Sequence, residues 1–151
     1  MTDGAVRSYA VALLLAVSIG VPVGIGSYTF WYGRGYSYLS DDPAACVNCH
    51  IMRDNYDSWS VSSHRSVTCN GCHVPHDLAG KYVAKMEHGL RHSAAFTFGD
   101  VQVIQITPKS LSDVQHNCVR CHEPTVAFVL PDGDVSERFC TRCHRGAGHV
   151  S

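Results

Sequence analysis

The eight cysteines of this 151-residue chain occur as four pairs, and two residues separate the members of each pair. A histidine follows every pair directly. The pairs with their histidines are Cys46/Cys49 with His50, Cys69/Cys72 with His73, Cys118/Cys121 with His122, and Cys140/Cys143 with His144. Covalent attachment of haem uses all three positions, because the two thiols bond to the porphyrin and the histidine binds the iron. The sequence therefore predicts four covalently bound c-type haems.

Other uses of paired cysteines explain less of the pattern. A disulfide scaffold needs no histidine after each pair, and two zinc ribbons would leave the four histidines unexplained. Haem attachment uses every cysteine of the chain. It takes place outside the bacterial cytoplasm, so the chain must be exported. The net charge of −1 gives no basic surface for nucleic acid, and we expect no such partner.

An apolar segment without charged residues runs from Tyr9 to Tyr32. It exceeds the roughly 20 residues that cross a membrane and the apolar region of a signal peptide, which is about 7–15 residues long. Aromatic residues at its end suit the membrane–water interface. We expect residues 1–33 to be a transmembrane anchor in the inner membrane, with a cytoplasmic N-terminus and a periplasmic haem domain over 34–151. A cleaved signal on a soluble cytochrome is the alternative.

About 120 residues remain for four haems, which is too few to enclose them in a conventional core. The predicted fold is mainly α with little regular structure, in which short helices and loops surround the four haems. The clearest helix spans residues 77–96, and 129–135 is expected to form a loop or short hairpin.

The predicted helix carries two different faces. Leu78, Tyr82, Met86 and Leu90 repeat every four residues and form an apolar face, whereas Lys81, Lys85, His88 and His92 share another face. Such a polar stripe is often only a solvated surface. Because it follows a haem motif in an anchored chain, a role in accepting protons competes with that interpretation.

Four irons have up to eight axial positions, and the motif histidines supply at most four ligands. His64 and His149 are plausible donors for the remaining positions. From spacing alone, His50 binds the first haem and Met52, two residues later, is a buried bystander.

Several segments resemble the NapC/NirT family of tetrahaem quinol dehydrogenases, and within it the small membrane subunits of cytochrome c nitrite reductase. They are the N-terminal anchor, YLSDDPAACVNCHIM, SSHRSVTCNGCHVPH, KYVAKMEHGLRHSAAFTFG, NCVRCH and CTRCHRGAGH. The resemblance extends from Tyr9 to His149. It implies a menaquinol dehydrogenase that passes electrons to a periplasmic pentahaem cytochrome c nitrite reductase, which reduces nitrite to ammonium.

The resemblance also changes the ligand assignment. It implies that Met52 replaces His50 as ligand of the first haem, whose iron then stays high-spin and open beside the quinol site. Further implied ligands are His73, His122 and His144 for the second, third and fourth haems, with His64 and His149 completing the third and fourth in an unassigned order. The second haem would take a lysine from the catalytic partner.

Lys85 matches a lysine at the quinol site of the family. Some members carry an aspartate seven residues later, where this chain has His92. Because seven residues make two helical turns, Lys85 and His92 share a face. Histidine has an ordinary pKa near 6.5, so His92 is a candidate acceptor of quinol protons. It could also bind the first iron.

Two other functions stay open at this point. One is a quinol dehydrogenase that serves another periplasmic reductase, for nitrate or trimethylamine N-oxide. The other is a soluble multihaem electron shuttle, or a small haem reductase that needs no partner.

Overall fold

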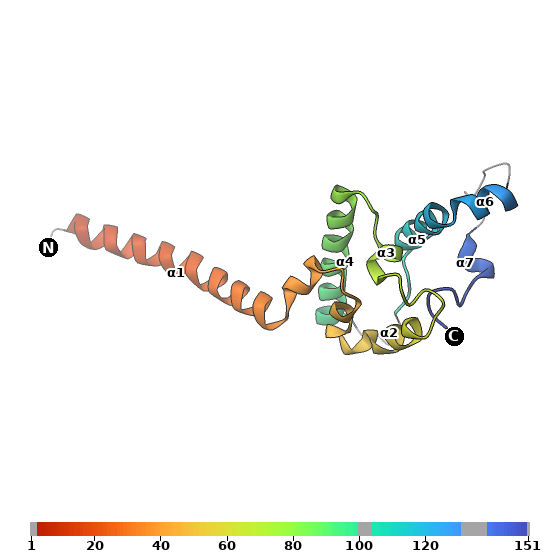
Figure 1. Cartoon of the computed structure of the whole chain (residues 1–151). Coiled ribbons are helices and arrows are strands. Elements are labelled where there is room, and N and C mark those ends of the chain that lie inside the picture. Colours follow the sequence, from red (N-terminus) through yellow and green to blue (C-terminus); the bar gives the residue numbers. More distant parts are fainter. Residues whose placement is uncertain (1–2, 100–103, 131–138, 151) are drawn as a thin grey trace. The chain divides into compact units, whose positions relative to one another are not determined.

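The computed structural model describes residues 3–99, 104–130 and 139–150, and within these ranges it contains helices and no strand. The prediction of a mainly α fold is confirmed. Most of the hairpin expected at 129–135 lies outside the described residues. The helices, in chain order (Figure 1), are α1 (Asp3–Tyr32), η1 (Gly35–Leu39), η2 (Pro43–Asn48), η3 (His50–Met52), α2 (Arg53–Ser60), α3 (Cys69–His73), α4 (Leu78–Phe98), α5 (Pro108–Cys121), α6 (Glu123–Val129) and α7 (Cys140–Cys143).

The chain divides into two compact units, Met1–Leu39 and Ser40–Ser151. The first consists of α1 and η1. With 30 residues and a mean hydropathy of 2.1, α1 is long and apolar enough to cross a membrane. Its large apolar side chains are exposed, as expected of a helix whose surroundings are lipid.

Aromatic rings gather where α1 ends. Tyr28 stacks on Tyr32 with ring centroids 5.7 Å apart, and Trp31 lies 5.6 Å from Tyr36. The chain leaves the helix through Arg34, which has a positive φ of 52°. At the next residue, a side chain on Gly35 would collide with the Phe30 ring. Aromatic residues in this position match the belt expected at a membrane–water interface.

In the second unit, polar side chains begin three of the helices that carry haem motifs. Asp42 accepts a hydrogen bond from the backbone of Ala44 at the start of η2. Thr68 caps α3, and Thr107 caps α5. Each cap satisfies a backbone N–H that has no partner within its helix. The caps therefore fix where the attachment helices begin.

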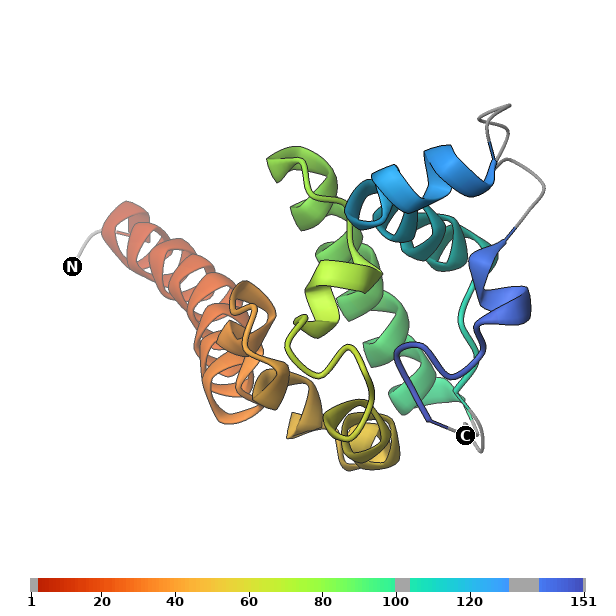
Figure 2. The ribbon, with the colours of Figure 1, turned by 45° about the vertical axis from the view of Figure 1, so that its right-hand side comes forward.

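Two buried amides of α5 join three motif segments. The amide of Asn117 donates to the carbonyls of Cys72 and Val74, both at 2.9 Å. The side-chain oxygen of Gln115 accepts from the backbone N–H of Cys140 at 2.9 Å. Accordingly, α5 packs against both α3 and α7, as Figure 2 shows. One helix thus holds the second, third and fourth motifs together.

The described part of the chain buries very little apolar surface of its own. Val74 and Ala84 are the buried hydrophobic residues within it, and no large side chain there is fully buried. The buried polar residues outnumber them: Ser62, Lys85, Ser110, Gln115 and Asn117. Packing against covalent haem would account for a fold with so small a core, since helices need an apolar surface to pack on.

Candidate functional site

The four cysteine pairs lie next to one another in the order of the sequence. The Cys46 thiol hydrogen-bonds that of Cys69, and this contact raises the pKa of Cys69. Burial raises the pKa of Cys72, and Cys121 acts on it electrostatically. In the same way, burial raises the pKa of Cys118 to about 11, with Cys140 nearby. Each haem motif therefore lies beside the next motif in the sequence, from the first to the fourth.

All eight cysteines are unpaired, so the structure contains no disulfide scaffold. The residues that the structure describes include no group of three or more His, Cys, Asp or Glu side chains able to hold a metal ion. Neither alternative to haem gains support from this arrangement.

The first motif differs from the other three at its second cysteine. Cys49 follows the last residue of η2 with an extended backbone, at φ −92° and ψ 114°, and it is exposed. In each of the other motifs both cysteines belong to one α-helix, α3, α5 or α7. Residues three apart in a helix lie on one face, which brings the two thiols of such a motif together. The first motif therefore differs from the others in its backbone at Cys49, and the bond of Cys49 to haem stays a prediction.

The exposed motif cysteines share a position. Besides Cys49 they are Cys121 and Cys143, so each is the second cysteine of its pair, and the remaining five cysteines are half-buried. The protein itself therefore covers little of these three thiols. A porphyrin bonded to them would lie against the open side of each motif.

Three pairs of histidine rings have the separation that an iron between them requires, and two of these pairs include a motif histidine. The rings of His64 and His122 lie 6.0 Å apart, and those of His73 and His149 lie 6.1 Å apart. A bond from a metal to an imidazole nitrogen is about 2 Å long, so two imidazoles on opposite sides of one metal have centroids roughly 6 Å apart. The two pairs that include a motif histidine therefore have a spacing compatible with two irons, each with two histidine ligands.

Hydrogen bonds orient the two histidines that lie outside the motifs. The Nδ1–H of His64 donates to the carbonyl of Ala147 at 2.8 Å. The Nδ1–H of His149 donates to the carbonyl of Asn55 at 3.0 Å. In each ring Nε2 then carries no proton and can bind metal, an arrangement typical of histidine ligands in proteins.

His73 is half-buried at the end of α3. Burial, with smaller effects of His149 and His88, lowers the pKa of His73 to about 4. The ring is neutral at physiological pH, as a metal ligand must be.

The structure places His149 beside His73, the histidine of the second motif. The family resemblance led us to expect His149 at the third or fourth haem. His64 lies beside His122 of the third motif, which agrees with one of the two assignments left open. His144, which follows α7, is exposed.

The first motif is distributed over two short helices. Cys46 belongs to η2, Cys49 joins the two helices, and His50 and Met52 belong to η3. His50 is exposed, whereas Met52 is half-buried at the start of α2. This placement is compatible with either residue as the iron ligand, and the choice of Met52 stays a prediction.

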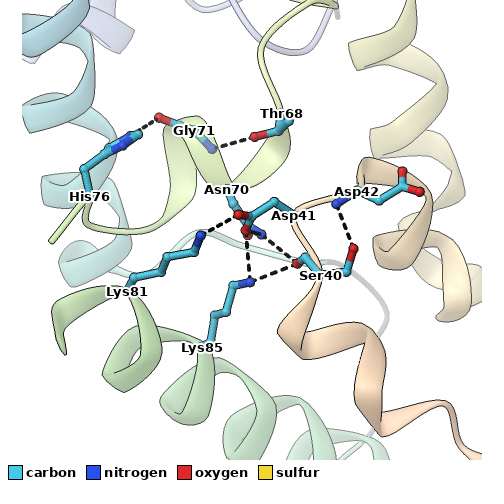
Figure 3. A network of polar contacts seen from close by, with 9 residues as sticks. All are labelled: Ser40, Asp41, Asp42, Thr68, Asn70, Gly71, His76, Lys81 and Lys85. Atoms are coloured by element: carbon cyan, nitrogen blue, oxygen red, sulfur yellow. Dashed lines mark hydrogen bonds and ion pairs between the residues drawn. The ribbon is translucent and has the colours of Figure 1, made fainter. Parts of the chain in front are cut away.

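The two lysines of α4 meet a carboxylate from the segment that precedes the first motif (Figure 3). Asp41 forms ion pairs with Lys81 and, at 3.1 Å, with Lys85. Lys85 also donates to the carbonyl of Ser40 at 2.9 Å, and the amide of Asn70 donates to Asp41 at 2.7 Å. These contacts, led by the hydrogen bond from Lys81, hold the pKa of Asp41 well below its usual range.

This group of polar residues lies beside the first haem motif. Lys85 acts electrostatically on the Cys46 thiol. A cavity of about 150 Å³ lies beside Asp41, and Lys81 and His76 contribute to its lining. The sequence indicated the lysines through their helical spacing, but nothing local distinguished Asp41 or Asn70 as their partners.

His92 lies one turn beyond His88 on α4, and the two rings stack with centroids 6.2 Å apart. His88 also contacts the hydroxyl of Ser110 at 3.1 Å. Partial removal from water, followed by the charges of His88 and Arg91, lowers the pKa of His92. A lowered pKa favours the neutral ring, which is the form that can accept a proton.

Comparison with known proteins finds similar cytochromes c over most of the chain. The profile of the NapC/NirT cytochrome c family, N-terminal region, matches residues 6–107. The chain belongs to the NapC/NirT cytochrome c family. The cytochrome c-type protein NrfH of Wolinella succinogenes is 34% identical, and the match covers 93% of this chain and 85% of that protein.

Two further comparisons connect this NapC/NirT cytochrome with nitrite reductase complexes. The cytochrome c nitrite reductase subunit NrfH of Nitratidesulfovibrio vulgaris is 31% identical over 77% of this chain and 72% of that subunit. A crystal structure of the cytochrome c nitrite reductase NrfHA complex bound to the HQNO inhibitor contains a similar chain. It has a TM-score of 0.66 and 28% identity, over 92% of this chain and 90% of that one.

Proposed function

We propose that this protein is a membrane-anchored tetrahaem cytochrome c that oxidises menaquinol and passes the electrons to a periplasmic pentahaem cytochrome c nitrite reductase. The observation that carries the proposal is the order of contacts among the four haem motifs, with Lys85 beside the first. Haem bound at these motifs would supply one-electron carriers close to one another. Similarity to NrfH proteins along most of the chain supports the choice of acceptor.

The quinol would be oxidised at the first motif, where Lys85 and His92 are the proposed catalytic residues. Lys85 would donate a hydrogen bond to a quinol oxygen, and His92 would accept a proton. Met52 is the proposed ligand of the first iron. As a neutral, weakly binding thioether it would leave the opposite side of the iron accessible.

The remaining ligands follow from the histidine pairs described above. His73 and His149 would bind the second iron, His122 and His64 the third, and His144 the fourth. This assignment departs from the partner lysine expected at the second haem. A ligand supplied by the partner would instead be needed at the fourth motif, at the far end of the series from Lys85.

Residues 1–33 would form the anchor, with the N-terminus in the cytoplasm and the domain over 34–151 in the periplasm. This orientation rests on where haem is attached, because Arg7 and Asp3 before the apolar segment give no charge bias. Quinol protons would then be released on the periplasmic side.

Purification of the full chain from gently solubilised membranes tests the proposal. A pentahaem nitrite reductase should co-purify, and the preparation should form ammonium from nitrite when a menaquinol analogue is supplied. The same reductase without this chain is the control and should not use the quinol. Co-purification of a nitrate or trimethylamine N-oxide reductase would assign another acceptor, and turnover of ubiquinol in preference to menaquinol would change the quinone.

A further inference from the structure

Asp41 lies outside every sequence motif that indicates a function. Its carboxylate contacts three side chains, those of Lys81, Lys85 and Asn70. They belong to two segments more distant in the sequence, α4 and the second haem motif. Asp41 itself lies five residues before Cys46. It is thus the point at which the first motif, the second motif and α4 are joined.

The partners of Lys85 leave it little freedom. Its side chain is 8% exposed, and its ammonium donates to the Ser40 carbonyl at 2.9 Å and to Asp41 at 3.1 Å. A lysine ammonium has three N–H donors, so these two hydrogen bonds leave one for a ligand, and Nζ also lies 6.0 Å from the centroid of the Tyr82 ring. Burying an ammonium without an opposite charge is costly, and the pair with Asp41 offsets that cost.

We propose that Asp41 is a positioning residue of the quinol site, which holds the Lys85 ammonium in place and directs its remaining N–H toward a quinol oxygen. The inference rests on the proposed function. In this arrangement Lys85 is a donor that stabilises developing negative charge on the quinol oxygen, and it is not the proton acceptor. Preorganised donors of this kind stabilise charge without reorganising during the reaction.

Lys81 and Asn70 have supporting parts in this network. Lys81 is paired to the other carboxylate oxygen, and Asn70 donates to the oxygen that faces Lys85. Both contacts restrict rotation of the carboxylate. Removing Asn70 should therefore weaken ligand binding through Lys85, but less than removing the charge of Asp41.

The test uses the full-length haem-loaded chain in detergent and measures binding of HQNO, the inhibitor bound in the related NrfHA complex. Asp41→Asn keeps the shape and removes the charge. HQNO affinity should fall about tenfold or more, and the KM for a menaquinol analogue should rise more than kcat falls. Asp57→Asn removes a charge that is also exposed, on α2, and is the matched control, expected to bind as the wild type does.

A double-variant cycle separates positioning from a general structural role. In a Lys85→Gln background, Asp41→Asn should have no further effect on HQNO affinity, because its effect passes through Lys85. Additive losses, or unchanged affinity in Asp41→Asn, would overturn the inference. Where Asp41→Asn does not accumulate with its haems, Asn70→Ala should lower the affinity two- to fivefold, and no loss there would overturn it too.

The wild-type chain distinguishes an error in the proposed function from an error in the role of Asp41. If the wild-type chain neither binds HQNO nor oxidises the quinol, the quinol site itself is wrong and the role of Asp41 falls with it. If the wild type binds and Lys85→Gln abolishes binding while Asp41→Asn does not, the quinol site stands and the positioning role alone is refuted.

Discussion

Replacing Asn117 tests whether the haem motifs are held together by the buried amide of α5. The residue is 6% exposed, and both N–H groups of its amide donate to carbonyls at 2.9 Å, those of Cys72 and Val74. A buried hydrogen bond contributes about 1 kcal/mol net, and a carbonyl left without a donor costs about 1–3 kcal/mol. Asn117→Ala should therefore lower the free energy of unfolding by about 2–4 kcal/mol.

A variant of the same shape, Asn117→Asp, tests the hydrogen bonds more directly than alanine does. Asn117→Asp keeps the shape but sets a carboxylate against two carbonyl oxygens, so it should destabilise the protein more than alanine does. The assay is thermal unfolding of the haem-loaded chain in detergent at pH 8, where the new carboxylate is ionised. The alanine variant should lose roughly 5–10 °C in Tm. Gln105→Ala, at an exposed amide, is the control and should be unchanged. An aspartate variant as stable as the wild type, or milder than alanine, would refute the assigned hydrogen bonds.

Three further predictions concern the histidine pairs, Asp41 and Gln115. His64→Ala and His149→Ala should each convert one haem to the high-spin state, which electron paramagnetic resonance of the isolated chain would detect. If either variant leaves the low-spin signals intact, its assigned pair is wrong. The pKa of Asp41 is lowered by its lysines, so its stabilising contribution is complete above its ordinary pKa of about 4 and is lost as the pH falls below it. Unfolding followed from pH 5 to pH 2 should therefore show a smaller acid loss in Asp41→Asn than in the wild type, and parallel curves would contradict this. Gln115→Ala removes the acceptor of the Cys140 N–H and should lower the unfolding free energy by about 1 kcal/mol or more, measured as the Tm in the same assay.

Local patterns in the sequence were sufficient for the features that depend on neighbouring residues. The haem motifs are contiguous, the apolar segment of α1 is continuous, and the stripe on α4 follows from helical spacing. Lys81 and Lys85 indeed lie on one face and share the partner Asp41. The helical class of the fold followed from the same local patterns. The break at Cys49 did not, because the four motifs have the same spacing whether or not a helix runs through them.

The sequence did not reveal contacts between distant segments. Asp41 and Lys85 are 44 residues apart, and Asn117 and Cys72 are 45 apart. The sequence does not distinguish an aspartate that pairs with a distant lysine from one that only faces water. Nor does it distinguish an asparagine whose amide joins two segments from one that is solvated. The pairing of His149 with His73 is of the same kind, because nothing near either residue specifies the other.

His64 and His149, the two histidines outside the motifs, are each oriented by a carbonyl from the segment near the other. His64 is oriented by the carbonyl of Ala147, two residues before His149, and His149 by the carbonyl of Asn55 at the other end of the 55–64 segment. Each segment thus supplies a proposed ligand and also orients the ligand of the other. Because the carbonyl fixes which ring nitrogen carries the proton, displacement of either segment would disturb both irons. The second and third haem sites should consequently form together, as one unit held by the C-terminal segment.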